Sequence, residues 1–160
     1  MFEELADSPP LRLAAEALRA RFGDSLLESS YERKELSIKV RTRDLLAVLR
    51  FLKDEHGFNA LNDIIALDRF PRSGEGTKRF SILYQLYQFP GRLRIRIEID
   101  VDDSEPVASV TPLFRSADWA EREIFDMFGL RFSGHPDLRR IYLAEDFAGH
   151  PLRKDFPLEG

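Results

Sequence analysis

The stretch from Arg92 to Val101 alternates without interruption between charged and apolar side chains. Arg, Glu or Asp occupies every even position of this stretch, and Leu, Ile or Val every odd one. Successive side chains of a β-strand point to opposite faces, so a period of two predicts a strand with one buried and one solvated face. One-sided burial is typical of antiparallel sheets. The chain is therefore expected to build a sheet with helices packed on one face.

The remaining elements follow from the same kind of pattern. Residues 45, 48, 49 and 52 are apolar at helical spacing, which predicts a helix over residues 42–56 that ends at Gly57. A helix after Ser8 has a serine cap and an early proline, and Gly23 is expected to stop it. Further strands are expected at residues 36–40, 58–70, 80–89 and 107–113, the last closing the same sheet.

A third helix is predicted from about Asp118 to Gly129. Asp118 and Glu121 have the spacing of a capping box, and Arg122 is four residues from Asp126, which favours an ion pair along the helix. Glu121 and Glu123 are two residues apart, so they face different sides. They are therefore poorly placed to share a substrate as a general acid and base, and an ion-paired or solvated face is the preferred interpretation.

The composition changes after the third helix. Residues 131–160 are rich in proline and glycine, with aromatic residues scattered among charges. Such a segment has no periodicity that could bury its own rings, so it is interpreted as an extended arm that needs a surface. The expected fold is α+β: a mixed, mainly antiparallel sheet of four to five strands with packed helices and an extended C-terminal arm. We expect a sheet domain at residues 1–115 and the helix with its arm at residues 116–160.

The composition also excludes several kinds of chemistry. The chain contains no cysteine, which excludes disulfides, thiolate metal sites and cysteine-ligated iron–sulfur clusters within it. Its net charge of −4 and the lack of a basic stripe argue against nucleic acid as a partner. No stretch approaches the length that spans a bilayer, and the first residues do not resemble a secretory signal, so a soluble, cytoplasm-facing protein is expected.

Two weaker motifs have plainer explanations. Gly74–Lys78 resembles a phosphate-binding loop but has its threonine and lysine in the wrong order, so a polar hairpin loop is the preferred interpretation. His135, Asp137 and His150, with Glu145 and Asp146, could in principle hold a metal. They fall in turns without the spacing of a helical site, and we expect the histidine rings to bond to backbone instead.

Three segments together resemble one known family. Residues 121–129 read EREIFDMFG, residues 134–141 read GHPDLRRI and residues 149–158 read GHPLRKDFPL. Upstream, Phe58, Leu61, Asp63, Ala66 and Asp68 fit the same pattern. The combination resembles the C subunit of respiratory complex I, also called its thirty-kilodalton subunit, where a tyrosine often stands in place of Phe156.

The resemblance implies a scaffold role in NADH:quinone oxidoreductase, with catalysis belonging to the whole complex. It implies no cofactor, flavin or cluster in this chain, and a place in the peripheral arm on the cytoplasmic side of the inner membrane without direct membrane insertion. The implied partners are the D subunit, of the forty-nine-kilodalton type, which helps to form the quinone site, and other peripheral-arm subunits. A functional homo-oligomer is not expected. Related subunits occur in formate-, ferredoxin- or deazaflavin-dependent and hydrogenase-type complexes, which stay open as alternatives.

We expect the partner-binding residues to lie in the third helix and the arm. The aromatic anchors are Trp119, Phe132, Tyr142 and Phe156, and the basic clamps are Arg139, Arg140, Arg153 and Lys154. The other expected contributors are Glu121, Arg122, Glu123, Asp126, His135, Asp137, His150 and Asp155.

Overall fold

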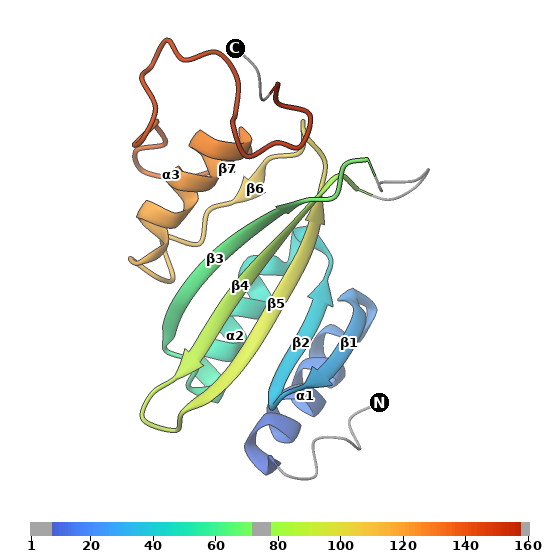
Figure 1. Ribbon diagram of the computed structural model, residues 1–160. Helices are drawn as coiled ribbons and strands as arrows, with labels where there is room; N and C mark the ends of the chain where they lie inside the picture. Colours follow the sequence, from blue (N-terminus) through green and yellow to red (C-terminus); the bar gives the residue numbers. More distant parts are fainter. Residues whose placement is uncertain (1–7, 72–77, 158–160) are drawn as a thin grey trace. The chain divides into compact units, whose positions relative to one another are not determined.

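The fold is known from a computed structural model that describes residues 8–71 and 78–157 (Figure 1). Most of the phosphate-loop-like motif, apart from Lys78, and the last residue of the GHPLRKDFPL motif lie outside these residues. Contacts divide the chain into two compact units: unit 1 is Met1–Asp63 with Leu83–Ile99, and unit 2 is Ile64–Ile82 with Asp100–Gly160. Compactness does not measure independent folding, so the predicted division after residue 115 stays a prediction.

The described residues form a five-stranded sheet in the order β1-β2-β5-β4-β3. The strands are β1 (Leu26–Glu32), β2 (Glu35–Val40), β3 (Ala60–Asp68), β4 (Phe80–Gln88) and β5 (Leu93–Val101). Strand β1 is antiparallel to β2, whereas β2 is parallel to β5, with Ile38 opposite Ile97. The predicted mixed α+β sheet is confirmed. Strand β1 was not predicted, because its residues LLESSYE carry no clear alternation.

Unit 1 contains two helices, α1 (Pro9–Phe22) and α2 (Leu45–His56), which lie on one face of the strands in Figure 1. The predicted ends of α2 are close to the observed ones, and Gly57 ends it in the left-handed conformation, with φ of 70°. Gly23 stops α1 as predicted, since the helix ends at Phe22 and Gly23 is its C-cap, but it does so without a left-handed conformation. Gly23 keeps right-handed helical angles and opens a 3-10 turn, Gly23–Ser25, so the chain tightens there instead of reversing.

The core of unit 1 lies between these helices and the strands. The alternating residues Leu36, Ile38 and Val40 of β2 are buried, and so is the predicted apolar stripe of α2. The helix and strand periods therefore meet in a single apolar layer. The helical contribution to this layer is Leu11, Ala14, Ala15, Leu18, Leu45, Val48, Leu49 and Leu52.

Unit 2 contains helix α3 (Ala117–Phe128) and a small parallel sheet of β6 (Val107–Ala108) and β7 (Phe132–Ser133). The predicted strand at residues 107–113 was wrong in length and in partner. Only two of its residues pair, and they pair with β7 instead of the large sheet. At Val110 the chain turns, and its carbonyl accepts the N–H groups of Leu113 and Phe114.

The predicted capping box of α3 is also wrong. Ser116, not Asp118, stands at the N-cap, and within the described residues it makes no side-chain capping bond. The Glu121 side chain turns into the protein instead of back toward the helix start. Gly129 ends the helix as predicted, with φ of 74°.

Helix length and composition set one further limit. Within residues 8–71 and 78–157, no helix is both long and apolar enough to cross a membrane.

Candidate functional site

The carboxylate of Asp126 organises the segment that follows α3. Its side chain is fully buried, and Oδ2 accepts the backbone N–H groups of Ile141, Tyr142 and Leu143 at 2.8–3.1 Å. Arg140 Nη1 donates to Oδ1 at 3.0 Å. Burial opposes ionisation, but these four hydrogen bonds outweigh it and lower the pKa of Asp126. The predicted pair between Arg122 and Asp126 was therefore wrong, because Asp126 faces inward.

The end of α3 is held by the last part of the chain. His150 Nδ1 bonds to the carbonyl oxygen of Asp126 at 2.9 Å, and Arg153 Nε donates to the carbonyl oxygen of Phe128 at 2.6 Å. These are carbonyls that a helix end leaves without a partner in the helix itself. The approach requires Gly129, because a Cβ there would lie 2.6 Å from His150 Nε2.

Glu121 forms a second buried acidic centre, at the start of α3. Its side chain is fully buried, with Oε2 accepting from the Ser109 hydroxyl at 2.6 Å and Oε1 from the Val110 N–H at 2.7 Å. Burial raises the pKa of Glu121, which two hydrogen bonds only partly offset. The carboxylate thus ties α3 to the chain that leaves β6.

His135 packs beside Glu121. Its ring nitrogen Nε2 bonds to the carbonyl oxygen of Asp118 at 3.1 Å, and Nδ1 accepts the N–H of Asp137 at 3.0 Å. Since Nδ1 accepts, Nε2 carries the proton in the neutral ring. Both this histidine and His150 are therefore bonded to backbone, as the sequence predicted.

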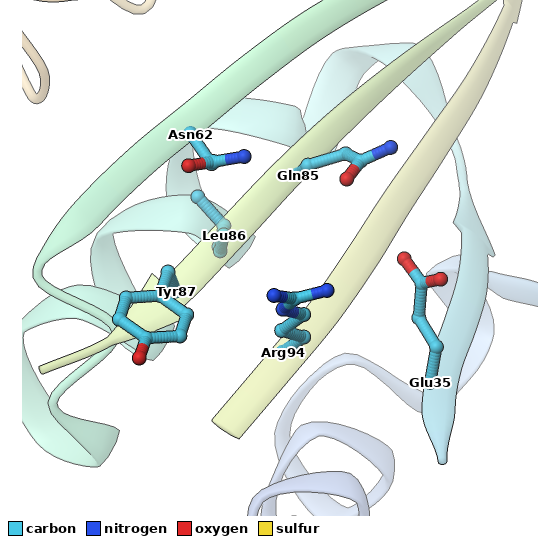
Figure 2. Close-up of a pocket in the computed structure, with 6 residues that line it drawn as sticks. All are labelled: Glu35, Asn62, Gln85, Leu86, Tyr87 and Arg94. Carbon is cyan, nitrogen blue, oxygen red and sulfur yellow. The ribbon is translucent and has the colours of Figure 1, made fainter. Parts of the chain in front are cut away.

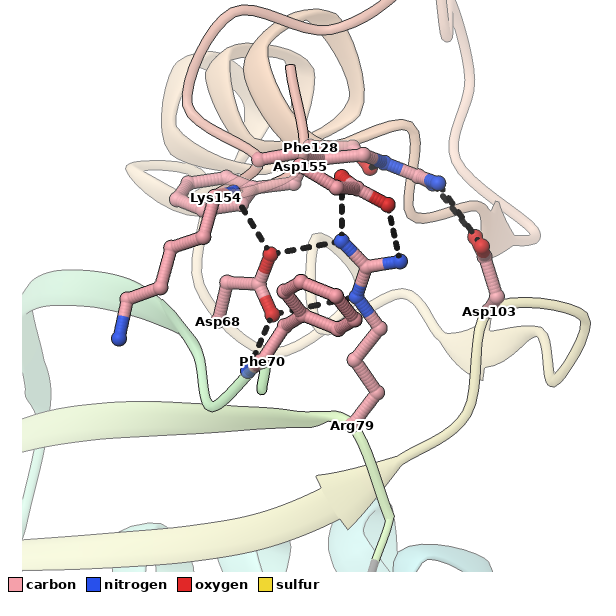
Figure 3. A network of polar contacts seen from close by, with 8 residues as sticks. Asp68, Phe70, Arg79, Asp103, Phe128, Lys154 and Asp155 are labelled. Atoms are coloured by element: carbon pink, nitrogen blue, oxygen red, sulfur yellow. Dashed lines mark hydrogen bonds and ion pairs between the residues drawn. The ribbon is translucent and has the colours of Figure 1, made fainter. Parts of the chain in front are cut away.

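A third network joins the tail to β3 and β4 and is drawn in Figure 3. Arg79 donates to Asp68 at 2.8 and 3.1 Å and to Asp155 at 2.7 and 3.0 Å, and the N–H groups of Phe70 and Lys154 also reach Asp68. Burial opposes ionisation of Asp68, but these donors prevail and lower its pKa to about 2. The same ion pairs raise the pKa of Arg79.

Arg153 extends this network to the loop after β5. Its guanidinium makes two bonds to Asp103, at 2.5 and 2.8 Å, and its charge centre lies 5.4 Å from the ring centroid of Phe80. Two parallel N–H···O bonds fix orientation as well as distance. The tail from Arg140 to Asp155 is therefore anchored within unit 2 through its polar groups.

The aromatic rings near this anchor point remain exposed. Trp119 and Tyr142 are 54% and 58% exposed, meet edge to face at 6.3 Å, and share a 3.3 Å hydrogen bond from indole Nε1 to the phenolic oxygen. Arg122 lies 5.5 Å from the Trp119 ring and donates to the carbonyl oxygen of Arg139. These four residues are called the aromatic patch below.

The structure separates the predicted partner-binding residues into buried, exposed and internally bonded side chains. Glu121, Asp126 and Phe132 are buried, and they hold unit 2 together instead of facing outward. Glu123, Asp137, Arg139 and Lys154 are exposed, while Phe156 is half-buried and stacks on Phe147 at 6.1 Å. Asp155 and the partly buried Arg140, His150 and Arg153 serve as internal anchors.

Arg79, Asp103 and Ser109 were not predicted, although each takes part in these networks. Asp68 belonged to the upstream family pattern, and this was the one signal that pointed toward the Arg79 network. Glu121 and Glu123 face different sides of α3 as predicted, since Glu121 is buried while Glu123 is exposed. Among the described residues, no group of three or more His, Asp or Glu residues is arranged to hold a metal.

Comparison with known proteins gives a consistent result. A sequence profile described as "Respiratory-chain NADH dehydrogenase, 30 Kd subunit" matches residues 38–160. The NADH-quinone oxidoreductase C subunit of Trichlorobacter lovleyi is 45% identical over 148 residues, which is 92% of this chain and 90% of the relative. The corresponding C subunit of Geotalea uraniireducens is 39% identical over 157 residues, or 98% and 93% of the two chains.

Solved structures agree. A trypsin-resistant fragment (1–134) of Nqo5 superposes with a TM-score of 0.70 at 29% identity, covering 81% of this chain and 99% of the fragment. A chain of the archaeal membrane-bound sulfane sulfur reductase gives 0.76 at 22% identity, covering 91% and 84%, and so shares the fold. With the profile spanning most of the chain and relatives matched over nearly their whole length, the chain belongs to the family of the respiratory-chain NADH dehydrogenase 30 Kd subunit, the C subunit of NADH-quinone oxidoreductase.

Proposed function

We propose that this chain is a non-catalytic scaffold subunit that docks on the forty-nine-kilodalton-type subunit through the aromatic patch. The observation that carries the proposal is a contrast between polar and aromatic groups near α3. Polar groups of the segment after α3 turn inward onto Asp126, while Trp119 of α3 and Tyr142 of that segment remain more than half exposed. Tryptophan, tyrosine and arginine are the residues that most often dominate binding energy at protein interfaces.

The rigidity of the surface supports the same role. The backbone N–H of Tyr142 bonds to Asp126 and its phenolic oxygen accepts from Trp119, so less backbone and side-chain freedom is left to lose on binding. Arg122 provides a cation beside the Trp119 ring, suited to carboxylates or carbonyl oxygens of a neighbour. A preorganised aromatic pair with a basic rim is what a stable docking surface requires.

We also propose that the isolated chain does not transfer electrons from NADH to quinone. The buried acids Glu121 and Asp126 are fully occupied by structural hydrogen bonds, which leaves them without an open substrate position. The chain would then act only within the assembled oxidoreductase, peripheral to the membrane and on its cytoplasmic side.

The docking proposal is tested by substitution within the complex. Trp119→Ala is expected to weaken association with the forty-nine-kilodalton-type subunit by about 30-fold, the effect of a hot-spot residue. Leu27→Ala is the control, since Leu27 is a large apolar residue 53% exposed in β1 of unit 1 and outside the patch. Retention of the partner by the Trp119 variant, measured as co-purification at equal expression, would contradict the proposal.

A second candidate is an equivalent scaffold in a related formate-, ferredoxin-, deazaflavin-dependent or hydrogenase-type complex. This second candidate is supported by the fold that the chain shares with a chain of the sulfane sulfur reductase. Purification of the intact complex decides between the two. An NADH-oxidising flavoprotein among the co-purified subunits supports the first candidate, and its replacement by another electron-input subunit supports the second.

A further inference from the structure

A basic cleft lies at one end of the strands of unit 1. None of its lining residues belongs to α3 or to the segment after it. Strands β2 and β5 are parallel neighbours, so the β1–β2 turn and the β4–β5 turn both fall at the end where these strands begin. The cleft there is lined by Tyr31, Arg33, Lys34, Tyr87, Arg92 and Arg94, with Ser8 and Leu11 from the start of α1. We call it the basic cleft.

An adjoining pocket continues the basic cleft along the sheet. Figure 2 shows Glu35, Arg94 and Tyr87 on three neighbouring strands, β2, β5 and β4, with Arg94 between the other two. These three residues line both hollows. The amides of Asn62 and Gln85 line the second hollow. Together the two hollows present cations, phenol groups and amide groups to a ligand.

The four cations of the cleft are close together, and they lack acidic partners among the described residues. Among the described residues, Arg33, Lys34, Arg92 and Arg94 make no ion pair. The one acid in the lining, Glu35, is instead bonded to Arg96 at 3.0 Å. In a chain of net charge −4, four unpaired cations around one hollow create a local positive potential that attracts acidic groups.

Three of these cations also occupy backbone positions that would suit glycine better. Arg33, Lys34 and Arg92 have φ of 51°, 66° and 59°, in the left-handed region where a Cβ is disfavoured. Each turn could form more easily with glycine. The chain therefore places cations at turn positions where the backbone itself would favour glycine.

Helix α1 adds to the same potential. Its 14 residues begin at Pro9 and Pro10, so the positive end of its dipole lies beside Ser8 and Leu11 in the cleft lining. No single one of these features defines a site. Their coincidence around one hollow does, because every charged contributor except the paired Glu35 has the same sign.

We propose that the basic cleft is a second docking surface, which binds an acidic polypeptide segment of another subunit. The inference rests on the proposed scaffold function, which supplies a polypeptide neighbour. The cations are exposed and distributed over two turns and the start of β5, whereas a small anion needs donors that converge on one point. Tyrosine and leucine side chains between them suit a peptide with both carboxylate and apolar side chains.

The direct test titrates the full, isotope-labelled chain with a synthetic peptide of alternating glutamate and leucine and follows backbone amide resonances. Shifts are expected to gather at the β1–β2 and β4–β5 turns and to weaken with added salt. A lysine–leucine peptide of equal length is the sign control. Inorganic phosphate and vesicles of anionic phospholipid are titrated separately, and tighter binding of either at the same turns would overturn the polypeptide assignment.

Two variants test the residues. Lys34→Glu with Arg92→Glu is expected to weaken peptide binding by about tenfold or more, since like charges then face the ligand. Arg19→Glu with Arg50→Glu removes two exposed helical cations of unit 1 and changes the net charge equally, so it controls for bulk electrostatics. Equal weakening by both pairs would overturn the proposal.

The glycine pair Lys34→Gly with Arg92→Gly separates binding from folding. It relieves two left-handed side-chain positions, so the melting temperature should rise while peptide binding falls. Unchanged binding by this pair would also overturn the proposal. The result is independent of the Trp119 test. A chain that does not hold the forty-nine-kilodalton-type subunit can still bind the acidic peptide, and a chain that does not bind the peptide can still hold that subunit.

Discussion

Arg140 and Asp126 form a buried ion pair, with Nη1 and Oδ1 3.0 Å apart, between a helix and a tail that has no regular structure of its own. Their side chains are 15% and 0% exposed. The pair turns a proline- and glycine-rich segment into an ordered one, since the same carboxylate also accepts three successive N–H groups. Asp126 of α3 therefore fixes the backbone conformation of residues 140–143.

Substitution of Asp126 tests this arrangement. Asp126→Ala leaves the Arg140 guanidinium and three N–H groups without their acceptor, and it should lower the free energy of unfolding by about 3–5 kcal/mol. Asp137→Ala is the control, because it breaks an exposed pair with Arg139 and should cost about 1 kcal/mol or less. Urea unfolding gives both values, and similar losses in the two variants would contradict the assigned role of Asp126.

The low pKa of Asp68 predicts a specific acid dependence. Its pKa is lowered from 3.8 to about 2, so the ionised form contributes stability above the unfolded value, and this is lost as the pH falls through the folded value. The contribution is about 2 kcal/mol. The stability difference between the wild type and Asp68→Asn should thus shrink between about pH 4 and pH 2. A constant difference in urea unfolding across that range would refute the assignment.

The sequence predicted the parts of the fold whose signal is local. The alternation in β5 and the apolar stripe of α2 each reflect contact with one continuous core, so pattern and structure agree. Strand β1 escaped prediction because it lies at the sheet edge, where its pairing with β2 requires no alternation. The predicted strand at residues 107–113 was too long, because the length of β6 is set by its pairing with Phe132 and Ser133, more than twenty residues later.

The candidate site was harder to predict, because its contacts join residues that are distant in the sequence. Glu121 and Asp126 read as surface charges of an amphipathic helix, and nothing in their spacing indicates burial. Their partners lie 11 to 17 residues away, in segments without periodicity. Only the family resemblance marked these positions as important, and it gave no reason. The structure provides the reason, since each carboxylate replaces hydrogen bonds that irregular backbone cannot make to itself.

Gly129 offers a test of how closely the tail approaches α3. Gly129→Ala places a Cβ 2.6 Å from His150 Nε2 in a left-handed conformation, so both strain and displacement of the ring are expected. Gly134→Ala is a matched control, with φ of +82° but nothing within 4 Å of the new Cβ. The control should lose about 1 kcal/mol and the Gly129 variant clearly more, with new trypsin cleavage after Arg153.

Glu121 should respond to pH in the opposite sense from Asp68. Burial raises the pKa of Glu121 above 4.5, so the unfolded chain releases the proton more readily, and the wild type loses stability as the pH rises from the unfolded value through the folded one. Glu121→Gln removes that loss, while its amide can still accept from Val110 and donate to the Ser109 oxygen. The glutamine variant should therefore gain on the wild type between pH 4.5 and 7.

The alanine variant separates charge from packing at the same position. Glu121→Ala leaves the Val110 N–H and the Ser109 hydroxyl unsatisfied beside a small void, and should cost about 2–4 kcal/mol at any pH. Thermal unfolding of the three proteins from pH 4 to 7 distinguishes the cases. If the glutamine variant falls relative to the wild type as the pH rises, Glu121 is stabilised as an anion, and burial does not raise its pKa.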